Sequence, residues 1–409
     1  MPIYRLENTI QNYAWGSSTA IAELLGQPSP SRDPQAELWM GTHPKGPSRV
    51  VVDGECMPLQ RLIEQDPRAV LGPHAADRFD NALPYLFKVL AAARPLSIQA
   101  HPSKDQAQKG FSKENQDHIP LDAPDRNYRD DNHKPEIICA LTPFWGVNGF
   151  RSAATAVRLL EPVCPEPLKK ALNSLMHHGE TGLRAFFESM VTLPDAARQS
   201  AARQIGEKAG RLAHSSPVYR WMTDLSGVYP HDMGVLSPAL LNLVCLQPGQ
   251  AMYLPAGQLH AYLDGVGIEL MANSDNVLRG GLTSKHVDVP QLLQVVRFRA
   301  TPVALLDPAA LRAGESVYPC PAEEFTLGVV HVSPEQPYGA PAVRSVEMLL
   351  CLSGRGEIHE DGKAGQRLSV KKGDSFLVPA ALDSYIIRGE AVVYKASVPL
   401  PPAVTPDEA

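Results

Sequence analysis

The sequence VCLQPGQAMYLPAGQLHAYLDG at residues 244–265 has a divergent copy, LSVKKGDSFLVPAALDSYIIRG, at residues 368–389. Each copy reads as an apolar strand, a turn that contains glycine, a second apolar strand, a Pro-Ala turn and a third strand. The copies share four turn residues, which pair as Gly249 with Gly373, Pro255 with Pro379, Ala256 with Ala380 and Gly265 with Gly389. Meanders of short strands build jelly rolls and related β-barrels, so the repeat predicts two β-barrel units in one chain.

The two copies differ at one position that is suited to metal binding. His260 follows the Pro-Ala-Gly turn of the first copy, whereas Ser384 takes its place in the second. A residue at the lip of a barrel strand can point into the barrel mouth. We therefore expect the second copy to keep the fold without the metal, and the chain to hold one site rather than two.

Differences in composition and in the spacing of apolar residues also divide the chain into regions. Residues 1–150 are rich in proline, glycine and short apolar runs, which predict many short strands. Residues 151–234 repeat apolar positions every three or four residues, which predicts helices. We predict a mainly β protein with an α-helical insert at 151–234. The first β-domain, residues 1–150 plus 235–309, carries the metal site, and residues 310–409 form a second β-domain without metal.

Composition excludes several function classes. The chain has 409 residues, which predicts two or three domains, and a formal net charge of -6. No basic patch stands out, and no apolar run approaches the ~18 residues that span a membrane, so we expect neither nucleic acid nor a membrane as partner. The six cysteines are scattered without a CxxC pair, and the N-terminus reads as a strand rather than a signal peptide. Both features favour a cytoplasmic protein with reduced thiols.

Four metal-capable side chains lie in three segments that are far apart in the chain. Gln99 and His101 are two residues apart, so on a strand both point to one face. Glu136 opens an apolar run, and His133 would face the opposite side of a regular strand. His260 is the fourth. A metal site assembled from distant segments is usually catalytic, because structural zinc sites use closely spaced Cys or His pairs.

Longer stretches of the chain resemble one family. They occur in the order QNYAWGS (11–17), AELWMG (36–41), LFKVL (86–90), LSIQAHP (96–102), NY (127–128) with DNHKPE (131–136), LHAYL (259–263) and NSDNVLRGGLT (273–283). In this order they resemble the class I mannose-6-phosphate isomerases (phosphomannose isomerases). The resemblance implies a pair of cupin-type β-barrels with a helical insert. It also implies one zinc ion, bound by Gln99, His101, Glu136 and His260.

The resemblance further implies an isomerase, an intramolecular oxidoreductase that interconverts mannose 6-phosphate and fructose 6-phosphate through an enediol. It places the active-site arginine at Arg279, whose permanent charge suits an enediolate better than proton transfer. Lys134 is the candidate for moving the proton between C1 and C2, unless it is a surface lysine. His133 and Asp275 are candidates for ring opening. Their alternatives are a hydrogen-bond partner and a turn residue.

The substrate phosphate needs cationic or hydroxyl partners. Three residues resemble the phosphate-side residues of the family, namely Lys88, Ser97 and Lys285, and Trp15 is a candidate wall of the sugar site. A lysine inside an apolar run, as Lys88 is, either reaches an edge or faces a polar cavity. The expected partner is therefore a small sugar phosphate, and the expected state is a monomer.

Two other functions stay open on the residues alone. His101, Glu136 and His260 would satisfy the two-His, one-carboxylate set of a non-haem iron oxygenase. Gln99 as a fourth ligand and the candidate phosphate lysines argue against that reading. A sugar-binding cupin whose metal is only structural is the third possibility.

Overall fold

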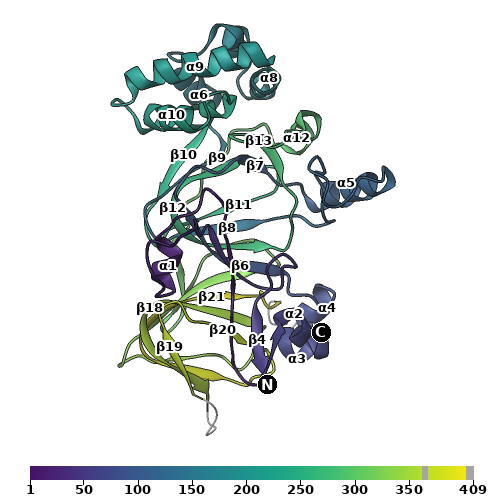
Figure 1. The fold of residues 1–409 in the computed structure, drawn as a ribbon, viewed down its shortest axis with the longest axis vertical. Coiled ribbons are helices and arrows are strands. Elements are labelled where there is room, and N and C mark those ends of the chain that lie inside the picture. Colours follow the sequence, from purple (N-terminus) through teal and green to yellow (C-terminus); the bar gives the residue numbers. More distant parts are fainter. Residues whose placement is uncertain (362–366, 402–409) are drawn as a thin grey trace, which may run out of the picture.

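The structure, a computed structural model, describes residues 1–361 and 367–401. It is mostly β-sheet with helices, as the sequence predicted. Its long axis runs from a group of helices at one end, through a ten-stranded sheet, to a nine-stranded sheet at the other end (Figure 1).

The ten-stranded sheet is built around one long strand. Its strands are β2 (Thr9–Gln11), β3 (Glu37–Met40), β6 (Tyr85–Ala92), β7 (Ile98–Ala100), β8 (Glu136–Ala140), β9 (Phe144–Phe150), β10 (Leu241–Leu246), β11 (Ala251–Leu254), β12 (His260–Ala272) and β13 (Leu278–Gly281). The long strand β12 pairs antiparallel with β6, β7, β8 and β9. Segments that are distant in sequence are therefore brought together on β12.

Strand β6 is buried along its whole length because both of its faces are covered. Phe87 and Val89 on one face share an apolar cluster with Met348 and Leu377 of the second sheet. Each such side chain contributes roughly 1.5–3 kcal/mol by leaving water. Successive side chains of a strand alternate between faces, so Lys88 points away from this cluster. The packing of the two sheets thus fixes the direction of Lys88.

The nine-stranded sheet draws on both ends of the chain. Its strands are β1 (Tyr4–Arg5), β14 (Ala309–Arg312), β15 (Glu315–Val317), β16 (Thr326–Val332), β17 (Tyr338–Gly339), β18 (Glu347–Glu360), β19 (Leu368–Lys371), β20 (Ser375–Val378) and β21 (Tyr385–Ser397). The first strand, β1, pairs antiparallel with β20, although it stands at the other end of the sequence. The boundaries of the domains stay a prediction.

The sequence repeat has matching backbone conformations in its two copies. Strands β10, β11 and β12 of the first copy correspond to β19, β20 and β21 of the second. Gly249 and Gly373 have φ angles of 87° and 88°, and Gly265 and Gly389 have φ angles of 123° and 122°. A residue with a Cβ atom rarely adopts such angles. The glycines that revealed the repeat are therefore the residues that its turns require.

The remaining elements are a hairpin and the helices. The hairpin pairs β4 (Arg49–Val52) with β5 (Glu55–Pro58). The α-helices are α1 (Ala20–Leu24), α2 (Leu59–Gln65), α3 (Pro67–Leu71), α4 (Pro73–Arg78), α5 (Lys104–Gln116), α6 (Ala153–Leu160), α7 (Lys169–His178), α8 (Glu180–Val191), α9 (Asp195–Leu212), α10 (Pro217–Val228), α11 (Ser237–Leu240) and α12 (Val289–Val295), with short 3-10 turns at Glu166–Leu168 and Met233–Leu236. Among residues 1–361 and 367–401, none of the helices combines the length and hydropathy that crossing a membrane needs.

Candidate functional site

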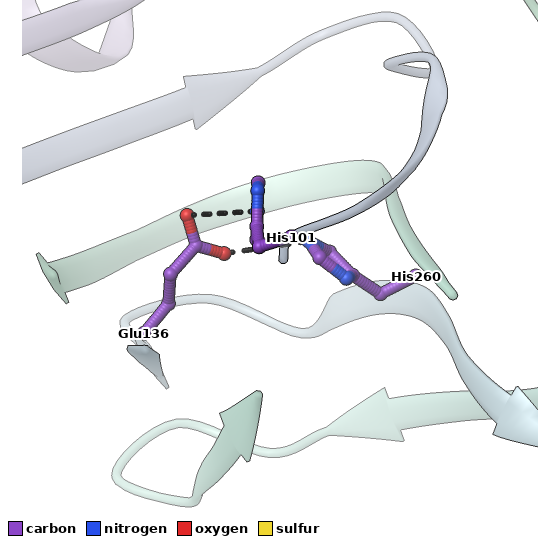
Figure 2. A group of neighbouring side chains, drawn as sticks. All are labelled: His101, Glu136 and His260. Atoms are coloured by element: carbon purple, nitrogen blue, oxygen red, sulfur yellow. Dashed lines mark ion pairs between the residues drawn. The ribbon is translucent and has the colours of Figure 1, made fainter. Parts of the chain in front are cut away.

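Three buried side chains from distant segments converge in the ten-stranded sheet. His101 follows β7, Glu136 opens β8 and His260 opens β12. Figure 2 shows the Glu136 carboxylate turned toward the two imidazole rings. Glu136 Oε1 lies 3.4 Å from His101 Nε2, and Glu136 Oε2 lies 3.3 Å from His260 Nε2. The predicted convergence of these three residues is confirmed.

These distances fit a metal ion. Two ligand atoms that are each about 2.0–2.1 Å from a tetrahedral zinc lie roughly 3.3 Å apart. His101 Nε2, Glu136 Oε2 and His260 Nε2 are buried and have no hydrogen-bond partner. Buried polar atoms are rarely left unpaired, since doing so costs the desolvation of each group. A cation between the three atoms would satisfy all of them.

The other nitrogen of each imidazole is held by the backbone. His101 Nδ1 lies 2.7 Å from the carbonyl oxygen of Asn276, and His260 Nδ1 lies 3.0 Å from that of Gln258. A carbonyl only accepts, so both Nδ1 atoms must carry the proton. The Nε2 lone pairs then face Glu136, as metal ligation by a neutral imidazole requires.

Strand pairing brings Gln99 and Arg279 to the same place. Gln99 on β7 is the Cα partner of His260 on β12 and of Arg279 on β13. Directly paired residues on neighbouring strands point to the same side of a sheet. His260, Gln99 and Arg279 therefore form a row, with the candidate fourth ligand between a histidine ligand and the predicted catalytic cation.

The charges in the centre depend on one another. Burial lowers the pKa of His101 from its ordinary value of 6.5, and Glu136 offsets this only in part. Burial alone would raise the pKa of Glu136, but the charge of Lys134 is the largest of the opposing effects, which together hold that pKa well below 4.5. At neutral pH the pair is therefore a neutral imidazole and a carboxylate, which are the forms that bind a metal.

We expect the metal-free protein to lose stability as the pH falls below about 6.5. Below that value the unfolded chain protonates His101 while the folded chain keeps it neutral, so acid favours unfolding. The depressed pKa of Glu136 adds a second loss below about 4.5. Urea unfolding between pH 7 and about 3 measures both. His101→Gln should flatten the slope between pH 6.5 and 5, and an unchanged slope would show that His101 does not contribute.

The centre lies beside a cavity of about 530 Å³. Its lining includes most of the residues predicted for the site, namely Trp15, Lys88, Ser97, Gln99, Lys134, Asp275, Arg279 and Lys285. Lys134 both lines the cavity and contacts a metal residue, because its Nζ lies 3.0 Å from Glu136 Oε1. One cavity thus brings the candidate metal, proton-transfer and substrate residues together.

The surroundings of Lys88 include two carboxylates that the sequence analysis did not consider. Its Nζ lies 2.8 Å from Glu269 Oε2 and 3.7 Å from Glu37 Oε1, and all three side chains are buried. Burial lowers the pKa of Lys88, but the two carboxylates outweigh it and raise that pKa above its ordinary value. A lysine neutralised by two carboxylates offers no net positive charge to a phosphate. Lys88 nevertheless lines the cavity.

Sequence reasoning missed the two carboxylates of this group. Glu37 also accepts a hydrogen bond of 2.7 Å from Trp39 Nε1, and both residues line the cavity. Glu269 interrupts the apolar run Gly267-Ile268-Glu269-Leu270 just as Lys88 interrupts its own run. The same signal was therefore present at Glu269, because a charged residue inside a buried strand requires a partner.

Another part of the cavity lining collects positive charge. Burial lowers the pKa of Arg279, and nearby Arg129 lowers it further. Burial also lowers the pKa of Lys285, and repulsion from Arg279 and Arg129 adds to the effect. Asp275 is ionised instead, because hydrogen bonds and charge from His43 and Lys45 overcome burial and hold its pKa below the ordinary range. An anion bound on this side would relieve the repulsion between the cations.

His133 is placed elsewhere. Its Nε2 lies 2.5 Å from Oε1 of Glu324, which precedes β16, and both residues line a different cavity of about 810 Å³. The hydrogen bond to His133 offsets burial and lowers the pKa of Glu324. The structure therefore places His133 at this second cavity and not at the one beside the metal residues, and its part in catalysis stays a prediction. His133 lies before the start of β8, and its hydrogen bond to Glu324 holds it on this side.

Comparisons with known proteins agree with this site. Residues 3–153 match the model of the family "Phosphomannose isomerase type I, catalytic domain". The chain is 42% identical to the mannose-6-phosphate isomerase of Escherichia coli (strain K12) over 94% of this chain and 97% of that protein. It is 34% identical to the human mannose-6-phosphate isomerase over 86% of this chain and 88% of that protein.

Solved structures agree as well. A crystal structure of mannose 6-phosphate isomerase with zinc bound superposes with a TM-score of 0.89 at 39% identity, covering 97% of this chain and all of that chain. A variant of phosphomannose isomerase from Salmonella typhimurium gives a TM-score of 0.90 with the same identity and coverage.

Proposed function

The chain belongs to the type I phosphomannose isomerase family, and from this membership we propose how its cavity performs the reaction. It is a zinc-dependent isomerase that interconverts mannose 6-phosphate and fructose 6-phosphate. The observation that carries this conclusion is the convergence of three unpaired ligand atoms of His101, Glu136 and His260 beside a cavity with cations on one wall. Family membership leaves the oxygenase and the non-enzymatic cupin without support.

The residues that would hold one zinc ion are His101, Glu136 and His260, and we assign Gln99 as the fourth ligand. Gln99 is paired with His260 and lines the cavity, so its amide oxygen can complete the set from the substrate side. Bound zinc supplies a fixed positive charge that polarises the oxygen atoms of the substrate.

We assign charge stabilisation to Arg279. The reaction moves a proton between C2 and C1 through an enediol, and negative charge develops on O1 and O2 as the proton leaves. The guanidinium stays charged at neutral pH, and it stands in the same row as Gln99. It can therefore donate hydrogen bonds to those oxygens as their charge grows.

Lys134 is our candidate for the proton transfer. Its side chain is nearly buried, lines the cavity and contacts Glu136, so it stands between the metal residues and the substrate. Asp275 is ionised and lines the same cavity, so it can accept a hydrogen bond from a hydroxyl group of the closed sugar during ring opening.

Substrate binding divides between two groups of lining residues. We assign the phosphate to Lys285, where the mutual repulsion of cations favours an anion, and to Ser97, which lines the same cavity. Lys88, held by two carboxylates, would donate to a sugar hydroxyl. Trp15 lines the cavity and stacks on Tyr13 with ring centroids 5.7 Å apart, so it offers an apolar wall to the sugar.

The finer features of the fold belong to the same proposal. We infer that the two sheets are cupin-type jelly-roll barrels related by the repeat, and that the C-terminal barrel has lost its metal at Ser384. The matched φ angles of the paired glycines support this relation. We further propose that the enzyme works as a monomer in the cytoplasm on a small sugar phosphate.

Incubation of the zinc-loaded protein with mannose 6-phosphate tests the proposed function. We expect fructose 6-phosphate to form without oxygen uptake, and the reverse reaction to occur with fructose 6-phosphate. Absence of turnover by zinc-loaded protein would overturn the isomerase assignment. Turnover that needs iron and consumes oxygen would favour the oxygenase instead.

A further inference from the structure

We propose that Asn276 is a positioning residue for the metal centre. Its buried side-chain amide fixes the backbone carbonyl that holds His101 in its metal-binding tautomer. The inference rests on the proposed zinc-dependent function and extends it to a residue that touches neither the metal atoms nor the substrate. Asn276 is fully buried and is not part of the cavity lining.

Asn276 is linked to the metal-binding residue His101 by a single short hydrogen bond. His101 Nδ1 lies 2.7 Å from the carbonyl oxygen of Asn276, and this bond directs His101 Nε2 toward Glu136. The position of one carbonyl thus sets both the tautomer and the orientation of one ligand. Partners of this kind typically change metal affinity by about 10–100-fold when they are lost.

The carbonyl is held in place by the amide of the same residue. Asn276 Nδ2 donates to the carbonyl oxygens of Asp130 and Asn132, both at 2.8 Å. Asn276 Oδ1 accepts from the backbone N–H of Arg129 at 2.7 Å and from that of Asp130 at 3.2 Å. The amide therefore bonds to four backbone groups of the segment 129–132.

Both joined segments lead directly into the site. Residues 129–132 precede Lys134 and Glu136, and Asn276 stands three residues before Arg279. The Asn276 amide therefore connects the segment that leads to Glu136 with the segment that leads to Arg279. A substitution of Asn276 would disturb His101 and both of these segments.

A neighbouring asparagine provides a matched control. Asn273 lies in the same loop, and its Nδ2 donates to the carbonyl oxygen of Leu83 at 2.7 Å. Its Oδ1 has no partner, and its side chain lines the cavity near His133 rather than the cavity beside the metal. Asn273→Ala therefore removes an amide from this loop without touching the carbonyl that holds His101.

The zinc dissociation constant, measured by chelator competition without substrate, tests the proposal. We expect Asn276→Ala to bind zinc about 10–100-fold more weakly, and Asn273→Ala to stay within about twofold of the wild type. Asn276→Asp keeps the size and the acceptor but loses the donors and adds charge beside Asp130, so it should also weaken binding. If Asn276→Ala does not fold, the zinc affinity of Asn276→Asp tests the proposal in its place.

Wild-type zinc affinity in a folded Asn276 variant would overturn the proposal, as would an equal loss in Asn273→Ala. Circular dichroism of the metal-free variants establishes that they are folded. Because the titration contains no substrate, its outcome is independent of the mannose 6-phosphate assay. Failure of this inference is therefore distinguishable from failure of the proposed function.

Discussion

Replacing Glu136 with glutamine is expected to remove stoichiometric zinc and to lower kcat/KM for mannose 6-phosphate by more than about 10³-fold. Glu136 is the one anionic member of the three converging residues, and its two oxygens lie 3.4 Å and 3.3 Å from the two Nε2 atoms. Glutamine has one oxygen and one NH₂ group, so one imidazole would face a donor. Lys134 would also lose its buried counter-charge.

Zinc analysis of the dialysed variant, together with the isomerase assay, measures this effect. Glu315→Gln is the matched control, because Glu315 is a buried carboxylate paired with Lys395 in the other sheet. That control should keep one zinc ion and most of the turnover, whatever it costs in stability. A Glu136→Gln enzyme with a full complement of zinc and normal turnover would contradict the ligand assignment.

Replacing Arg279 with alanine is expected to lower kcat by about 10²–10³-fold while one zinc ion stays bound. Arg279 contributes charge to the developing enediolate but is not a ligand, so turnover and metal binding should separate. Arg279→Lys should recover part of the rate, because it restores the charge without the planar fork of donors. Steady-state kinetics and zinc analysis of the same preparations test both statements.

The control for Arg279 is an arginine at a different cavity. Arg78 is exposed, pairs with Glu323 and lines the cavity that contains His133. Arg78→Ala should stay within about twofold of the wild-type rate, since exposed ion pairs contribute little. Full turnover by Arg279→Ala, or loss of its zinc, would remove Arg279 from the proposed role.

Much of the fold was predictable because the repeat rests on local chemistry. The turns at Gly249 and Gly373 need positive φ, so glycine marks them in the sequence. The position of β1 was not predictable, because a strand of two residues has no periodicity and its pairing with β20 spans the whole chain. Long-range pairing of short strands is set by the packing of the two sheets, which no local pattern records.

Side-chain directions in the site were predictable where they follow from alternation along one strand. They were not predictable where they depend on which residues pair between strands. Alternation predicted that Gln99 and His101 share a face and that His133 and Glu136 have different roles, and His133 does lie at a different cavity from the one beside the metal residues. The neutralisation of Lys88 depends on Glu269, its register partner on β12. That register is fixed only when the sheet has formed, so the sequence alone did not reveal the carboxylate partner of Lys88.

Anomalous X-ray diffraction at the zinc absorption edge, on crystals of the zinc-loaded enzyme, tests the central claim most directly. We predict one strong peak per chain, about 2.0–2.2 Å from His101 Nε2, His260 Nε2 and a Glu136 oxygen, with Gln99 completing the set. A principal peak elsewhere, or a second peak of equal strength in the C-terminal sheet near Ser384, would contradict it.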